Sequence, residues 1–318
     1  MTHPLESALN RALSIRLNLQ ITLSSLPIVE EWMDIHLDRW LEHIPTPPEM
    51  PAGHAVSFLA MLGSDLRRMW WGAWGDPAGM VPKLADYLKL CNVAKSDAAV
   101  LDRLGEKLEP KLVGPWVGVW GGKVTTGWHF WDPHSWDSVE PLFGTHEAKF
   151  KMKKWVADRK LERIERFTQS IGETAFSEFE FAAPGTTVGE QVDALAEGFQ
   201  HFSGAALPAH VVEMFHSAPD PQFALSVRIR GGEVVRTAAI APGMPMAMLT
   251  ELCTTMKTNC DPKLDRLVSA LAREGPNRIE VGRAGERGGV DVFVEPTESA
   301  RPPSKASADE PPPSSQAN

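Results

Sequence analysis

Helical spacing of apolar residues dominates the first third of the chain. Across residues 5–44, and again at 81–90 and 98–108, apolar residues recur every three or four positions, which predicts amphipathic helices. The nearly continuous apolar segment 54–74 predicts a buried helix. We therefore predict that residues 1–112 form a helical region.

Strand-like runs replace this spacing after Gly114. Residues 116–120 and 124–130 flank Gly121-Gly122. A Gly-Gly pair between two such runs is typical of a tight hairpin turn, whose backbone needs positive φ. Segment 176–181 alternates Phe with Glu, as expected of a strand with two different faces. The other predicted elements are helices at 149–171, 189–202, 249–256 and 263–273, a strand at 211–215, and hairpins at 223–240 around Gly231-Gly232 and at 278–294 turned near Gly288-Gly289.

Two short motifs occur twice in the same order, which predicts an internal repeat. WGGKV at 120–124 corresponds to RGGEV at 230–234, and DRKLERI at 158–164 corresponds to DPKLDRL at 261–267. The alternative is that a leucine followed by an acid, an arginine and a leucine is simply what an amphipathic helix contains. Two matched motifs at similar separations favour the duplication.

The repeat predicts the domain boundaries. Residues 113–205 and 206–296 each form a ββαβ-like unit, and Leu161 and Leu264 occupy the same buried helix position in the two copies. The Pro/Ser-rich segment 297–318 has too few apolar residues to form a core, so it is predicted to be a disordered tail.

The predicted fold class is α+β, with the N-terminal helical region packed on a duplicated, mostly antiparallel sheet that carries helices on one face. Repeated αββ units with Gly-Gly hairpins resemble the layout of the antiparallel barrel of aromatic prenyltransferases. This resemblance implies a barrel in which tyrosines and basic residues bind a diphosphate. The strands counted here are too few for such a barrel, and the chain has a single tyrosine, Tyr87, so we predict the sheet instead.

Charge and cysteine content exclude several classes of protein. The formal net charge is −9 at pH 7, and no block of Lys or Arg offsets it, which argues against nucleic-acid binding. Cys91, Cys253 and Cys260 are odd in number and widely spread, which favours a reducing compartment and hence the cytoplasm. No apolar run is long enough to span a bilayer, so we predict no membrane span.

Tryptophans are concentrated in residues 115–137, which hold five of the eleven in the chain. An indole combines a large apolar area with one hydrogen-bond donor, so this group could bind a ligand or a partner protein. The alternative is that it packs the hairpin against the N-terminal helices as an interdomain core. The five candidate binding residues are Trp116, Trp120, Trp128, Trp131 and Trp136.

The same stretch carries His129, Asp132 and His134, which are the candidate catalytic residues. Imidazoles and carboxylates together also suit zinc or iron, but the spacing across Pro133 matches no metal template. We therefore predict no metal site and leave any cofactor unassigned. The chain has no phosphate-binding glycine loop, no G-x-S-x-G elbow and no H-E-x-x-H motif.

An excess of aromatic residues without a convergent catalytic set favours a non-catalytic intracellular protein. It would bind a partner protein or an apolar, aromatic ligand through the Trp-rich hairpin. The alternative is an enzyme, a transferase or a hydrolase, with the His/Asp cluster in a cleft between the helical region and the sheet. Convergence of the two histidines and the aspartate at an apolar pocket would favour the enzyme.

Overall fold

The structure is a computed structural model of the 318-residue chain. At 56–61, 68–72, 113–120, 123–130, 142, 171, 242, 287 and 291–294 the description covers the backbone alone. The described residues are 56–61, 68–72, 113–120, 123–130, 135–142, 146–161, 164–171, 175–218, 222–242, 248, 251–252, 254, 278–285 and 287–294.

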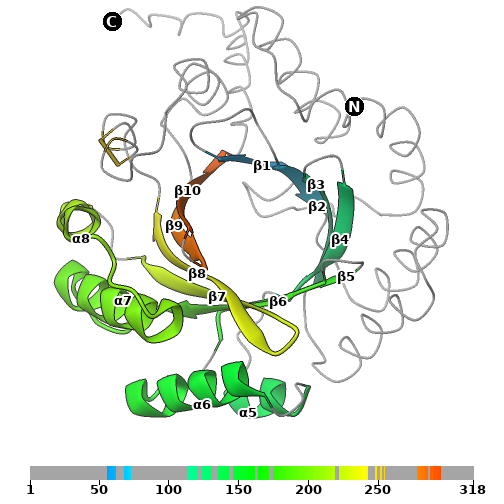
Figure 1. Ribbon diagram of the computed structural model, residues 1–318, viewed down its shortest axis with the longest axis horizontal. Coiled ribbons are helices and arrows are strands. Elements are labelled where there is room, and N and C mark those ends of the chain that lie inside the picture. Colours follow the sequence, from blue (N-terminus) through cyan, green and yellow to red (C-terminus); the bar gives the residue numbers. More distant parts are fainter. Residues whose placement is uncertain are drawn as a thin grey trace, which may run out of the picture.

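Ten strands of the described chain close into one antiparallel barrel, seen along its axis in Figure 1. Each strand pairs with the next along the sequence, and β1 pairs with β10, so that Ala60 lies opposite Val292 and the ring is complete. A closed sheet leaves no edge strand with unpaired backbone groups. The strands are β1 Val56–Met61, β2 Arg68–Gly72, β3 Val113–Trp120, β4 Lys123–Phe130, β5 Arg166–Ile171, β6 Ser177–Ala182, β7 Ala224–Arg230, β8 Glu233–Pro242, β9 Arg278–Ala284 and β10 Arg287–Val294.

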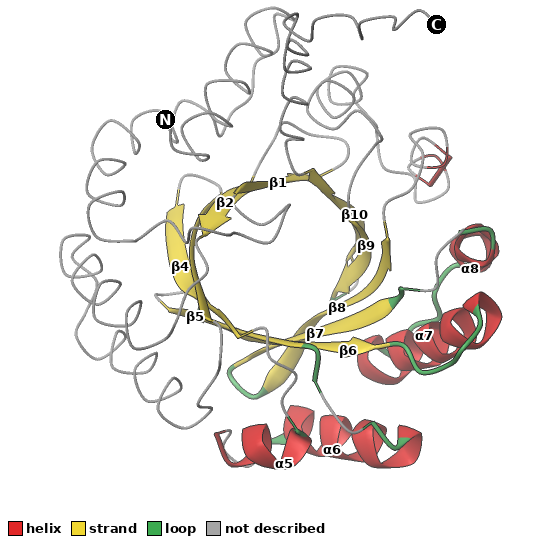
Figure 2. Cartoon of the chain, turned by 180° about the vertical axis from the view of Figure 1, so that it is seen from behind, coloured by secondary structure: helices red, strands yellow, loops and turns green. Residues whose placement is uncertain are grey.

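The described helices lie outside the barrel, on the side of β6, β7 and β8 (Figures 1 and 2). A unit of two strands followed by two helices occurs twice along the chain. In the first unit β3 and β4 precede α5 and α6, and in the second β5 and β6 precede α7 and α8. None of these described helices is both long and apolar enough to cross a membrane. The elements are α5 Trp136–Val139, the 3₁₀ helix η1 Glu140–Leu142, α6 Glu147–Arg159, α7 Val188–Ser203 and α8 Ala209–His216.

Local sequence signals fix the ends of α7. The Thr187 side chain accepts a hydrogen bond from the backbone N–H of Glu190, and the Glu190 carboxylate accepts from the backbone N–H of Thr187 at 3.2 Å. This reciprocal capping box satisfies two donors that a helix start otherwise leaves unpaired. Gly204 ends the helix in the left-handed conformation, with φ of 70°.

Aromatic residues on the outer face of the sheet form the core beneath the helices. Phe179 and Phe181 of β6 are fully buried, and the Phe179 ring lies 5.1 Å from that of Phe167 and 6.3 Å from that of Trp136. A methyl group at Gly198 of α7 would come within 2.8 Å of the Trp155 ring and nearer still to Leu225, so only glycine lets the helix approach this closely.

The Gly-Gly turn between β7 and β8 contacts the start of α6. Gly231 and Gly232 have φ of 60° and 83°, which confirms the predicted hairpin turn. The Gly232 carbonyl accepts a hydrogen bond from Ala148 at 3.3 Å, and His146 packs against Gly232. The His146 Nδ1 accepts from the backbone N–H of Lys149 at 3.1 Å. His146 is therefore the N-cap of α6.

Several predicted elements were assigned correctly. The α+β class, the predominance of antiparallel pairing, the hairpins at 116–130 and 223–240, the strand at 176–181 and the helix at 189–202 are confirmed. The inference that the chain has too few strands for a barrel was wrong, because ten strands close into one. The predicted boundaries at 113–205 and 206–296 remain predictions.

Three segments have a different structure from the predicted one. The predicted helix at 54–74 contains strands β1 and β2 instead, because a short apolar run does not show by its periodicity whether it is a helix or a strand. The predicted helix at 149–171 ends at Lys160, whose φ is 52°, and its second half forms β5. The predicted strand at 211–215 belongs to α8.

Two finer predictions also change. The last hairpin turns at Gly285, where φ is 59°, and not at Gly288-Gly289, which lie within β10. Leu161 follows the end of α6 and is only half-buried, so it does not occupy a buried helix position. Leu264, its predicted counterpart, lies outside the described residues, as do the segments predicted as helices at 5–44, 81–90, 98–108 and 263–273 and the tail at 297–318.

Candidate active site inside the barrel

Charged residues occupy the inner face of five neighbouring strands. In β6 the two phenylalanines face the helices, so strand alternation places Glu178 and Glu180 on the opposite face, inside the barrel. Strand register carries this face to Arg228 of β7, which lies opposite Glu178. The interior wall, as we call it, comprises Arg166 and Thr168 of β5, Glu178 and Glu180 of β6, Ser226 and Arg228 of β7, Arg236 of β8, and Arg278 and Glu280 of β9.

Four arginines and three glutamates of this wall alternate in one chain of ion pairs. The chain begins at Arg166, whose Nη2 lies 2.5 Å from Glu180, and Glu180 then pairs with Arg278 at 2.8 Å. Arg278 also pairs with Glu280 at 2.8 Å, and Glu280 pairs with Arg236 at 2.7 Å. The wall therefore holds its arginines in fixed positions on a surface shielded from water.

Glu178 completes the chain of ion pairs at its other end. Its Oε2 accepts hydrogen bonds from Nε and Nη2 of Arg228, at 3.1 and 2.7 Å. Its Oε1 accepts from the Ser226 hydroxyl at 2.5 Å and lies 3.9 Å from Nη1 of Arg236, the longest ion pair of the chain. The Arg228 guanidinium also stacks on the Phe176 ring at 4.1 Å. Glu178 thus sits between two guanidinium groups.

The arginines shift the pKa of each carboxyl group. Burial by itself raises the pKa of Glu178, but the positive charges of Arg228 and Arg236 outweigh it and hold that pKa well below its ordinary 4.5. Burial likewise opposes the ionisation of Glu280, but Arg236 and Arg278 lower its pKa to about 2. The pKa of Glu180 is also lowered, despite burial, by Arg166 and Arg278. All three carboxyl groups are therefore ionised at neutral pH.

Small residues leave room for the long side chains of the wall. A methyl group at Gly282 of β9 would lie 3.0 Å from Nη2 and 3.1 Å from Nε of Arg236, so the guanidinium lies directly against the backbone of Gly282. Ala238 of β8 stands opposite Gly282 and is fully buried. A side chain at Gly282 would therefore force Arg236 out of its present position.

Acid should destabilise the protein through these three glutamates. Each has a folded-state pKa below its ordinary value, so its contribution to stability is complete above pH 4.5 and is lost as the pH falls through the folded pKa. We expect the free energy of unfolding to fall between pH 4.5 and about 2, the lowered pKa of Glu280. Urea unfolding at a series of pH values measures this slope, which should be shallower in Glu280→Gln. An equal slope in that variant contradicts the assignment.

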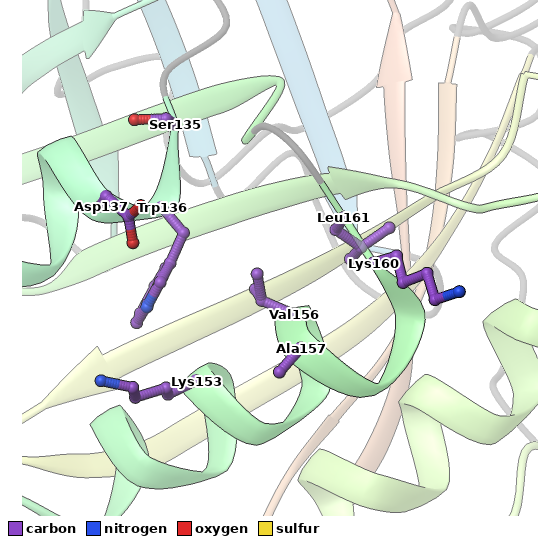
Figure 3. A pocket seen from close by; sticks show the side chains of 8 residues that line it. All are labelled: Ser135, Trp136, Asp137, Lys153, Val156, Ala157, Lys160 and Leu161. Carbon is purple, nitrogen blue, oxygen red and sulfur yellow. The ribbon is translucent and has the colours of Figure 1, made fainter.

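A pocket of about 540 Å³ lies on the outside of the barrel, between α5 and α6 (Figure 3). Trp136 points into it from α5, and Lys153 and Val156 line the side formed by α6. Lys153 is paired with Glu140 at 3.1 Å, and Asp137 and Lys160 add one charge of each sign to the lining. The full lining is Ser135, Trp136, Asp137, Lys153, Val156, Ala157, Lys160 and Leu161.

The structure places the candidate catalytic residues only in part. His129 belongs to β4, and its position is in register with Thr168, a buried residue of the interior wall. Its side chain, and Asp132 and His134 altogether, lie outside the described part of the chain. Their catalytic role therefore stays a prediction. Among the described residues, no group of three His, Cys, Asp or Glu side chains is arranged to hold a metal ion.

The structure describes the side chain of only one of the five candidate tryptophans. Trp116 and Trp120 belong to β3 and Trp128 to β4, where the description is of the backbone, and Trp131 lies outside the described residues. Trp136 is 6% exposed and packs against Phe179, so it contributes to the core beneath α5 as well as to the outer pocket. Ligand binding by these tryptophans stays a prediction.

Sequence reasoning missed the interior wall entirely. Its signal was present as charged residues at every second position of strands, in SEFEF and in the RIR of β7. In an open sheet this pattern indicates a face in contact with water. Only closure of the barrel turns the same face into a buried interior.

Comparisons with known proteins identify the fold. No protein-family model matches the chain, and no curated protein matches it. Among solved structures, the NotF prenyltransferase aligns with a TM-score of 0.64 and 10% identity, over 91% of this chain and 92% of that one. PriB in complex with L-tryptophan and dimethylallyl thiolodiphosphate gives 0.62 and 9%, over 91% and 94%. The 5-dimethylallyl tryptophan synthase of Streptomyces coelicolor gives 0.58 and 14%, over 93% and 95%.

The chain therefore has the barrel fold of these aromatic prenyltransferases. The layout resemblance noted from the Gly-Gly hairpins is to this fold, but the prediction set it aside in favour of a sheet. The prediction of a non-catalytic protein that binds through its Trp-rich hairpin is wrong, because the structural neighbours are enzymes, two prenyltransferases and a dimethylallyl tryptophan synthase. The alternative prediction, a transferase, agrees better with them. A protein partner stays a prediction.

Proposed function

We propose that the protein is an enzyme that transfers a prenyl group from a prenyl diphosphate to an aromatic acceptor inside the barrel. The observation that carries this proposal is the row of four arginines on the interior wall, of which Arg166 is buried and the other three are half-buried. Guanidinium groups bind phosphate oxygens with paired, directional hydrogen bonds, and burial strengthens that interaction. Structures with the same fold have been solved with diphosphate and with a prenyl thiolodiphosphate and tryptophan.

The proposed reaction divides the work between the arginines and the shielded interior. The bond between C1 of the prenyl group and the diphosphate oxygen breaks, and the arginines stabilise the negative charge that develops on the leaving diphosphate. An aromatic carbon of the acceptor then forms the new C–C bond. The proton on that carbon is lost to a basic group, which restores aromaticity. A closed barrel protects the allylic cation from water.

The wall as it stands is close to electrically neutral. Arg166, Arg228, Arg236 and Arg278 supply four positive charges against three carboxylates. An incoming diphosphate therefore meets arginines that already hold carboxylates. This feature distinguishes the site from an open patch of positive charge, and it restricts access to ligands that compete well for guanidinium groups.

The test is a direct assay of the full chain. The protein is incubated with dimethylallyl diphosphate and, separately, tryptophan, indole and tryptophan-containing cyclic dipeptides, and mass spectrometry detects acceptors that have gained one C5H8 unit. We expect a prenylated product from at least one indole, with equimolar pyrophosphate. If neither product is released from any acceptor, the proposed function is wrong.

Two arginine variants distinguish the loss of an interior-wall arginine from the loss of a positive charge elsewhere on the protein. Arg228→Met should lower the rate by roughly 100-fold, the usual effect of removing one preorganised donor from a developing anion. Arg159 of α6 is the control, because it lies outside the barrel, pairs with Glu197 and stacks on Trp155 at 5.0 Å. Arg159→Met should retain nearly the full rate, and circular dichroism checks that both variants are folded.

A further inference from the structure

Glu178 occupies the position in which an anion would contact two arginines at once. Its carboxylate is hydrogen-bonded to Arg228 of β7 on one side and lies within ion-pair distance of Arg236 of β8 on the other. Ser226 holds the same carboxylate through a 2.5 Å hydrogen bond. Two guanidinium groups around one carboxylate form the arrangement that a phosphate group would also require.

We propose that Glu178 is an internal anion that a diphosphate displaces from Arg228 and Arg236, and that Glu178 takes up a proton from solvent when this happens. The proposal rests on the proposed function and assigns one residue the control of anion binding at that site. In the structure, Glu178 fills the anion position itself. The ligand must therefore bind these two arginines more strongly than a built-in carboxylate does.

The long ion pair marks where the exchange begins. Arg236 holds Glu280 at 2.7 Å but Glu178 only at 3.9 Å, so the contact to Glu178 is the weakest link in the chain of ion pairs. The backbone of Gly282 lies against the other side of the Arg236 guanidinium and keeps it on the wall. Arg236 can therefore accept a new anion without giving up Glu280.

Proton uptake follows from the charges that face Glu178 on every side. Arg228 and Ser226 face it from β7, Arg236 from β8 and Arg166 from β5, while Glu280 of β9 is a nearby like charge. While the arginines are paired with Glu178, its carboxyl group stays ionised. When a diphosphate takes these arginines, a second anion stands beside a buried carboxylate, and the like charges favour the protonated acid.

Glu178→Gln gives a result opposite to that of losing a binding residue. The amide keeps the shape and can still accept from Ser226, but it carries no charge to compete with the ligand. We expect inorganic pyrophosphate to bind Glu178→Gln roughly tenfold more tightly than the wild type at pH 7, equivalent to one pKa unit of interaction. Isothermal titration calorimetry of the full chain measures both affinities.

The proton count is the decisive second readout. Titrations in two buffers of different ionisation enthalpy give the number of protons taken up with the ligand. Pyrophosphate itself titrates near neutral pH, so the informative quantity is the difference between proteins. We expect Glu178→Gln to take up about one proton fewer than the wild type. The matched control, Glu180→Gln, removes the same charge two residues away on the same strand face and should keep the wild-type proton count.

Each outcome decides a separate question. Wild-type protein that does not bind pyrophosphate overturns the proposed function. Wild-type protein that binds, with Glu178→Gln weaker or unchanged in proton count, overturns only the displacement of Glu178. If Glu178→Gln does not fold, Ser226→Ala replaces it, because loss of the hydroxyl frees Glu178 to move. Ser226→Ala should bind pyrophosphate more tightly, and equal or weaker binding overturns the proposal.

Discussion

Replacing Arg278 with leucine is expected to destabilise the protein by about 3–5 kcal/mol, the usual effect of removing one partner from a buried ion pair. Arg278 is hydrogen-bonded to Glu180 at 2.8 and 3.1 Å and to Glu280 at 2.8 and 3.0 Å. Leucine would leave both carboxylates buried beside an apolar side chain. Urea unfolding at pH 7 measures the change in the free energy of unfolding.

A second arginine on the same strand is the control for Arg278. Arg283 of β9 is half-buried and donates a hydrogen bond to the carbonyl of Gly285, 2.9 Å away, in a contact that is open to solvent. Arg283→Leu should change the stability by no more than about 0.5 kcal/mol, because it removes one solvent-exposed hydrogen bond and substitutions away from buried networks seldom do more. Similar losses in the two variants would mean that the interior wall is no more sensitive to charge than the surface.

Phe179→Ala is expected to cost about 3–5 kcal/mol, because it removes a large ring from a packed core that cannot fully close around the space. Phe179 is fully buried between Phe167 and Trp136, and so connects the outer face of β6 to helix α5. Thermal and urea unfolding provide two independent measurements of the loss.

Phe150 offers a matched control of the same residue type. It lies on α6 and is 60% exposed, so Phe150→Ala removes few buried contacts. We expect a change within about 0.5 kcal/mol of zero. If the two alanine variants lose the same free energy of unfolding, then the core between the sheet and α5 does not stabilise the protein as its burial indicates.

Turn chemistry and strand alternation were readable from the sequence because both are local. Gly231-Gly232 needs positive φ at both positions, and this requirement is visible in two adjacent letters. The alternation of Phe with Glu in β6 predicted two different faces correctly. It did not predict that the glutamates face a buried interior, since that depends on closure between β1 and β10, far apart in the sequence.

The errors had two separate causes. The segment at 54–74 consists of two short apolar runs on either side of the polar segment 64–68, SDLRR, and each run is too short to show a period that distinguishes a helix from a strand. The segment at 211–215 was predicted to be a strand but belongs to α8. Its buried residues Val211, Met214 and Phe215 have the three- and four-residue spacing of a helix, and that signal was available.

The candidate site was predicted less well than the fold. The ring of His146 caps α6, which shows that a histidine's chemistry alone does not tell whether its ring binds a ligand or the backbone. The arginines of the interior wall were overlooked because each lies in a different strand. Nothing in a linear sequence indicates that Arg166 and Arg278 hold the same glutamate.

The pairing of β1 with β10 has a consequence for how the protein is made. β1 is synthesised long before β10, so it cannot gain this partner until residues 287–294 have also left the ribosome. Until then the growing sheet has two open edges whose backbone groups can pair with another chain. Protein truncated before β10 should therefore aggregate during expression, and slow, late ring closure should make the yield sensitive to temperature and to chaperones.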